Sequence, residues 1–100
     1  MTINEWSDAT AMAEAVQNKT VSPQELVEAS IREAERTNPK INAIVSQRYE
    51  KALKEAETRD FSDKPFAGVP IFLKDLGQEQ AGEPSSAGSR LFTSYRAKET

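Results

Sequence analysis

The segment that most restricts how this chain can fold is a short apolar run, Val69 to Leu73, which ends on Lys74 and Asp75. It is entered through a Gly-Val-Pro turn and is too short for a helix, so the sequence predicts a buried strand over residues 69–74. Side chains on both faces of this strand would be apolar, which is typical of the interior of a sheet covered by helices. The run therefore predicts an α/β fold.

Apolar residues at helical spacing predict three amphipathic helices before this strand, over residues about 8–18, 22–37 and 47–58. The second helix has the clearest start, because Ser22 to Glu25 forms a capping box with proline at the first helical position. It is predicted to end near Asn38, because the residue before Pro39 is biased away from the α region. The third is predicted to begin at Ser46 or Gln47.

A second short strand is predicted over residues 41–45, so that strand, helix and strand follow one another. This order predicts two parallel strands joined by a right-handed crossover. Two strands do not make a stable sheet by themselves. The chain is therefore expected to hold the amino-terminal helices and first strands of a larger mixed sheet covered by helices. Residues 78–89, rich in Gly, Ser, Pro and Gln, are predicted to form a loop.

Two segments around the second strand resemble the amidase signature family of hydrolases. Members carry Gly-Val-Pro, three apolar residues and Lys-Asp, followed by a G-x-P-[ST]-[ST]-x-G-S segment; here these are Gly68 to Asp75 and Gly82 to Ser89. Nearly the whole chain can be aligned with the amino-terminal part of that family, with Asn42 to Val45 at an earlier strand. Leu76 stands where many members have asparagine, as in the branch that includes hydrolases of cyclic oligoamides.

The resemblance implies that residues 1–100 are the amino-terminal part of a single amidase domain, which hydrolyses a carboxamide C–N bond with a Ser-Ser-Lys triad. Lys74 matches the catalytic lysine, which acts as the base. The nucleophilic serine and the serine in a cis peptide belong to a later Gly/Ser-rich segment, so the chain alone is expected to be inactive. An ordinary lysine has a pKa of ~10.4, so a lysine base needs desolvation or a neighbouring cation.

Other interpretations stay open beside this one. Asp75 could orient Lys74, although a structural role is favoured, and Ser85 and Ser86 are expected to bond the loop backbone more than the substrate. Within the same family, the protein could instead be similar to a subunit of a tRNA-dependent amidotransferase. From another class, it could be a small non-enzymatic module that binds a partner helix with its apolar stripes.

The amino-acid composition restricts the classes of partner, cofactor and catalytic chemistry that this chain can have. The chain has no cysteine and no histidine, which excludes disulfides, thiolate metal sites and Ser-His catalysis within it. The net charge is −3 with interleaved signs, which gives no nucleic-acid footprint. No signal peptide or membrane-spanning run is found. We therefore expect a cytoplasmic protein without metal or cofactor. Its expected partners are a small amide substrate and the remainder of the amidase domain, with self-association of the fragment as a further option.

Overall fold

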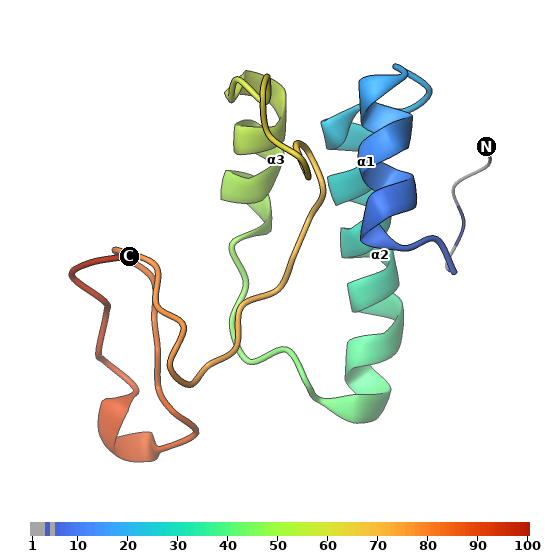
Figure 1. The fold of residues 1–100 in the computed structure, drawn as a ribbon. Helices are drawn as coiled ribbons and strands as arrows, with labels where there is room; N and C mark the ends of the chain where they lie inside the picture. Colours follow the sequence, from blue (N-terminus) through green and yellow to red (C-terminus); the bar gives the residue numbers. More distant parts are fainter. Residues whose placement is uncertain (1–3, 5) are drawn as a thin grey trace. The chain divides into compact units, whose positions relative to one another are not determined.

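The computed structural model describes residue 4 and residues 6–100 (Figure 1). It divides into two compact units, Met1–Pro70 and Ile71–Thr100. Over the described residues the regular elements are three α-helices, all in the first unit, and one short 3₁₀ helix in the second. The mixed sheet predicted from the sequence is not formed by these residues.

The first helix, α1, spans Ala9–Gln17, inside the predicted range 8–18. Its start is set by Asp8, whose Oδ1 accepts a hydrogen bond from the N–H of Ala11 at 2.8 Å, as expected of an N-cap. Its end is set by Lys19, which adopts the left-handed conformation with φ of 59°. The chain thereby reverses tightly before the second helix begins.

The second helix, α2, spans Pro23–Ile41 and confirms the predicted capping box. Ser22 Oγ accepts from the N–H of Glu25 at 3.1 Å, and Glu25 Oε1 accepts from the N–H of Ser22 at 3.3 Å. The predicted end near Asn38 is wrong, because Pro39 lies inside the last turn. Proline removes one donor there, but the N–H of Asn42 still donates to the C=O of Asn38 at 2.7 Å and closes the turn.

The strand predicted over residues 41–45 is also absent. Ile41 is the last residue of α2, and residues 42–48 have no regular structure. The side-chain amide of Asn38 takes up both backbone groups of Ile44: Oδ1 accepts from its N–H at 2.8 Å and Nδ2 donates to its C=O at 3.3 Å. These are the backbone groups that a neighbouring strand would otherwise bind. Asn42, in the left-handed conformation with φ of 50°, turns the chain at this point.

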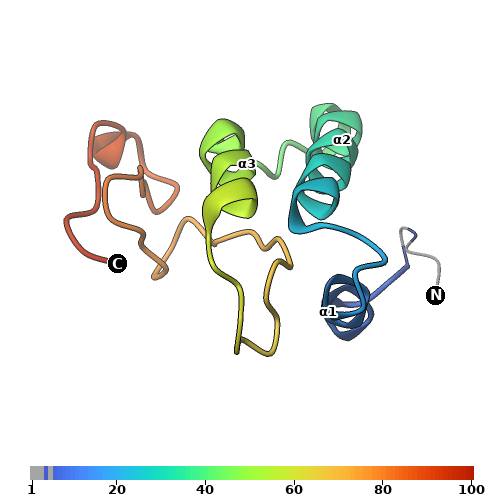
Figure 2. The ribbon, with the colours of Figure 1, turned by 90° about the horizontal axis from the view of Figure 1, so that it is seen from above.

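The third helix, α3, spans Tyr49–Thr58 and lies beside α2, running in the opposite direction (Figures 1 and 2). It begins later than predicted, and no side chain caps its first turn. The apolar face of α3 is only half-buried; it consists of Tyr49, Ala52, Leu53 and Ala56. The apolar stripe of α3 is therefore only partly covered by the rest of its unit.

The core of the first unit is small, with buried positions at Ala13, Ala15, Leu26, Val27 and Ala34. Gly68 packs against Pro23, the first residue of α2. A Cβ at Gly68 would lie 2.7 Å from Cγ of Pro23, and the φ of Gly68 is +82°. Only glycine fits this position without strain, because both the space and the backbone conformation exclude a side chain.

The second unit has no strand over its part of residues 69–74, contrary to the prediction. Ile71, Phe72 and Leu73 are irregular and exposed by 78%, 63% and 50%. A strand that is apolar on both faces needs neighbours on both edges, and residues 71–100 supply none. Its described residues form instead an isolated antiparallel bridge between Pro84 and Arg96.

Candidate active site

Lys74 is exposed and directly follows the exposed apolar run. Its backbone N–H donates to Oε1 of Gln78 at 2.9 Å. Within the part of the chain that the structure describes, its ammonium group makes no hydrogen bond and no ion pair, not even with Asp75. The predicted base thus has a backbone hydrogen bond that fixes its main chain and a side chain open to solvent.

Asp75, the next residue, binds a loop that follows it in the sequence. Its Oδ1 accepts from the N–H of Ser86 at 2.7 Å, and its Oδ2 accepts from the Ser86 hydroxyl at 2.5 Å and from the N–H of Gly88 at 3.3 Å. The backbone C=O of Asp75 accepts from the N–H of Ala87 at 2.9 Å. We call the bonds between this residue and residues 86–88 the Asp75 clamp.

The loop can wrap a carboxylate because of its backbone conformation. Ala87 and Gly88 both have positive φ, of 52° and 71°. Successive backbone N–H groups in a turn can point to one side and form an anion-binding concavity. Glycine adopts this conformation freely, whereas alanine there costs about 1–2 kcal/mol, which the hydrogen bonds of the clamp must offset.

The clamp also sets the charge of Asp75. The Ser86 hydroxyl, followed by the Ser86 N–H, holds the pKa of this carboxyl below its ordinary value of 3.8. The N–H groups of Gly88 and Ala87 act in the same direction, while burial opposes them. The cause is that these donors bind the ionised form better than the neutral one. Asp75 is therefore a carboxylate at neutral pH.

These contacts show that the carboxylate of Asp75 binds the loop, and that the hydroxyl of Ser86 donates to Asp75 and not to the loop backbone. The pairing of Asp75 with Ser86 itself was not predicted. The local signal for a turn here is Gly88 a few residues after Pro84, because proline favours turns and glycine adopts positive φ, whereas Ala87 gives no such signal. The sequence does not state which carboxylate such a turn would hold.

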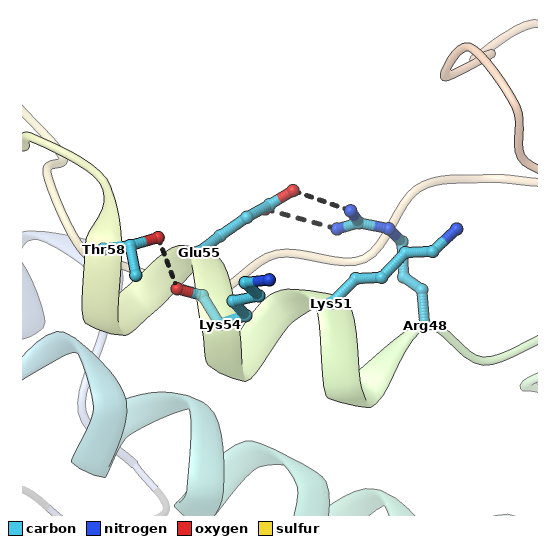
Figure 3. A pocket seen from close by; sticks show the side chains of 5 residues that line it. All are labelled: Arg48, Lys51, Lys54, Glu55 and Thr58. Carbon is cyan, nitrogen blue, oxygen red and sulfur yellow. Dashed lines mark hydrogen bonds and ion pairs between the residues drawn. The ribbon is translucent and has the colours of Figure 1, made fainter.

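A second group of polar residues lies on α3, where an open depression of about 310 Å³ is lined by Arg48, Lys51, Lys54, Glu55 and Thr58 (Figure 3). Arg48 and Glu55 form an ion pair at 2.7 Å. The Thr58 hydroxyl donates to the backbone C=O of Lys54 at 2.7 Å, so it is engaged by the helix itself. The depression therefore has no nucleophile paired with a base.

Among the described residues, no group of three or more acidic, cysteine or histidine side chains could hold a metal ion. None of the helices described combines the length and apolar character that crossing a membrane requires.

Comparison with known proteins places these residues in a family. Residues 25–100, which include Lys74 and the Asp75 clamp, match the family model described as Amidase. The chain is 43% identical over 94 residues to the 6-aminohexanoate-cyclic-dimer hydrolase of Paenarthrobacter ureafaciens, covering 92% of this chain and 18% of the relative. It is 40% identical over 86 residues to the lipoamidase of Enterococcus faecalis, covering 84% of this chain and 12% of the relative.

A third relative is a subunit of the glutamyl-tRNA(Gln) amidotransferase of Oleidesulfovibrio alaskensis, 34% identical over 90 residues, covering 86% of this chain and 18% of the relative. The chain thus spans less than a fifth of the length of each of these curated relatives. No solved structure gives a significant match. With the family model covering 76 of the 100 residues, from 25 to 100, the chain belongs to the amidase family.

Proposed function

We propose that this chain is the amino-terminal part of an amidase domain and that Lys74 is the base of its Ser-Ser-Lys triad. By full-length protein we mean the chain together with the rest of that domain. The observation that carries the proposal is the place of Lys74 at the end of the Gly68 to Asp75 segment, inside the region that matches the family.

In the proposed reaction, a serine hydroxyl attacks the carbonyl carbon of a carboxamide. Its proton passes through a second serine to the amine of Lys74, and the tetrahedral oxyanion is stabilised by backbone N–H groups. The C–N bond then breaks, and the leaving amine takes the proton. Water hydrolyses the resulting acyl-serine. Both serines are proposed to lie in the rest of the domain, so the chain alone is expected to be inactive.

The exposed apolar run supports a larger sheet. Ile71, Phe72 and Leu73 are exposed in succession, and within the described residues their backbone groups have no hydrogen-bond partner. Strands from the rest of the domain could pair with this segment on both edges and cover both faces. Such covering would also remove water from around Lys74, which a lysine base requires.

The decisive experiment replaces Lys74 in the full-length protein. We take 6-aminohexanoate cyclic dimer as the first substrate, because a relative is named for its hydrolysis, and hexanamide as a linear amide. Lys74→Arg retains a positive charge but cannot act as a base near neutral pH, so turnover should fall by about 10²–10⁴-fold. Lys98→Arg, at another exposed lysine of the same unit, should leave turnover unchanged. Near-normal turnover of Lys74→Arg would refute the proposal.

A second candidate is a subunit of a tRNA-dependent amidotransferase, favoured by the identity to the relative from Oleidesulfovibrio alaskensis. Turnover of the cyclic dimer by the full-length protein alone would favour the amidase. Activity that appears only with partner subunits and glutamyl-tRNA(Gln) would favour the amidotransferase. Membership of the family favours either enzyme over the non-enzymatic interaction module.

A further inference from the structure

We propose that Asp75 is a positioning residue for Lys74. It binds residues 86–88 through the Asp75 clamp, and so fixes the main chain that carries the base while keeping its own carboxylate from pairing with the ammonium. This inference rests on the proposed role of Lys74 and adds two residues, Asp75 and Ser86, to the machinery of the same site.

The first step of the argument concerns the main chain. The N–H of Lys74 donates to Oε1 of Gln78, which restrains the backbone at Lys74 itself. On the following side, Asp75 is tied by its C=O to Ala87 and by its side chain to Ser86 and Gly88. The Cα of Lys74 thus lies between two hydrogen-bonded points. Because a displacement of about 1 Å in a reacting group can cost 10²-fold in rate, fixing this main chain matters for catalysis.

The second step concerns charge. Asp75 is the acidic residue adjacent to Lys74 in the chain, yet the two side chains form no ion pair within the described residues. Both carboxylate oxygens are instead engaged by donors from residues 86 and 88. An ion pair with the carboxylate would favour the ammonium form of a lysine, which cannot accept a proton. The clamp therefore keeps the Asp75 carboxylate from pairing with Lys74.

The chain contains a chemically matched pair that serves as a control. Oδ1 of Asp60 accepts from the N–H of Ser62 at 2.9 Å and from the Ser62 hydroxyl at 2.7 Å. Like Asp75, Asp60 has its pKa lowered by hydrogen bonds from a serine, here the backbone N–H first and then the hydroxyl. This pair belongs to the first unit and lies outside the segment that carries Lys74. Substitutions of Asp60 and Ser62 therefore measure how far the loss of any Asp–Ser hydrogen bond in this protein affects activity.

The experiment measures kcat and KM of the full-length protein on 6-aminohexanoate cyclic dimer and hexanamide. Asp75→Asn places an NH₂ group opposite an N–H donor, so the clamp loses an acceptor as well as the charge. We expect kcat to fall by about 10–100-fold, because the Lys74 amine would be misplaced relative to the reacting serine. KM should change little, because Asp75 is not proposed to contact the substrate. Asp60→Asn should keep both constants near those of the unmodified protein.

Serine variants provide the second arm, for the case in which Asp75→Asn does not fold. Ser86→Ala removes the hydroxyl bond to Asp75 and should lower kcat in the same direction, whereas Ser86→Thr keeps a hydroxyl and should restore it. Ser62→Ala should have no such effect. The inference is overturned if Ser86→Ala and any folded Asp75→Asn protein retain normal kcat, or if the Asp60 and Ser62 variants lose as much.

The two proposals can fail separately. An inactive Lys74→Arg protein together with active Asp75→Asn and Ser86→Ala proteins would overturn the positioning role alone. An active Lys74→Arg protein would overturn the role of Lys74, and the positioning role with it.

Discussion

The carboxylate of Asp75 accepts a hydrogen bond of 2.5 Å from the hydroxyl of Ser86, a residue eleven positions later in the chain. This bond connects the residue that follows the proposed base to a loop in which Ala87 adopts a conformation that alanine normally avoids. Four hydrogen bonds to a single aspartate make it the organising residue of the second unit. Its charge state should therefore control that loop.

The first prediction concerns acid. The pKa of Asp75 is lower in the folded chain than its ordinary value of 3.8, so the clamp's contribution to stability is fully present above that value. It should be lost as the pH falls from there through the lowered pKa. The amide ¹⁵N and ¹H shifts of Ser86 and Gly88 should change together in that range. In Asp75→Asn this transition should be absent, and a transition that persisted would show that another group controls the loop.

The second prediction concerns Gly68. Gly68→Ala should destabilise the first unit by about 1–2 kcal/mol from its positive φ, and by roughly 1–3 kcal/mol more from the contact with Pro23. Gly77→Ala is the matched control, because its φ is +76° and nothing lies within 4 Å of the added Cβ. Urea unfolding followed at the amide signals of each unit gives both losses. Equal losses would mean that the contact with Pro23 contributes nothing.

The third prediction concerns the start of α2. Ser22→Ala removes the acceptor for the Glu25 N–H and should cost ~1 kcal/mol of stability. Ser30→Ala makes the same chemical change inside the helix, where alanine is the better helix former, and should be neutral or slightly stabilising. Urea unfolding followed by far-UV circular dichroism measures both. Similar effects of the two substitutions would argue against a specific cap.

The fourth prediction concerns the exposed apolar run in the 100-residue chain. Exposed apolar segments with unpaired backbone associate with one another, so this chain should self-associate as its concentration rises. Phe72→Lys should reduce the association, because it places a charge in the middle of the run. Leu91→Lys changes a residue that is 81% exposed outside the run and should have a smaller effect. Sedimentation velocity at several concentrations decides; a monomer throughout would contradict the prediction.

Features set by neighbouring residues could be predicted from the sequence. The capping box of Ser22 and Glu25 depends on residues within one helical turn, and it forms as expected. The end of α2 was misplaced because the bias of the residue before proline is only a preference, and Pro39 is accommodated in the last turn, where the N–H of Asn42 donates to the C=O of Asn38. The 69–74 strand could not form in this chain, since strand formation depends on partners distant in sequence.

The residues of the candidate site also differ in how far the sequence predicts them. Lys74 was singled out by a motif, and its assignment as the base stays a prediction. The pairing of Asp75 with Ser86 could not be foreseen, because it depends on Ala87 adopting a left-handed conformation that its residue type disfavours.

The exposed run at residues 71–73 also makes the chain a substrate for other enzymes. Proteases bind an extended segment whose backbone groups are free, and chymotrypsin-like enzymes cut after large apolar residues such as Phe72 and Leu73. The first cut should therefore fall here, close to the boundary between the two compact units, and release each as a separate piece. If the rest of an amidase domain covers this run, the same peptide bonds should resist cleavage in the full-length protein. The rate of digestion at residues 72 and 73 would then report whether the run is covered.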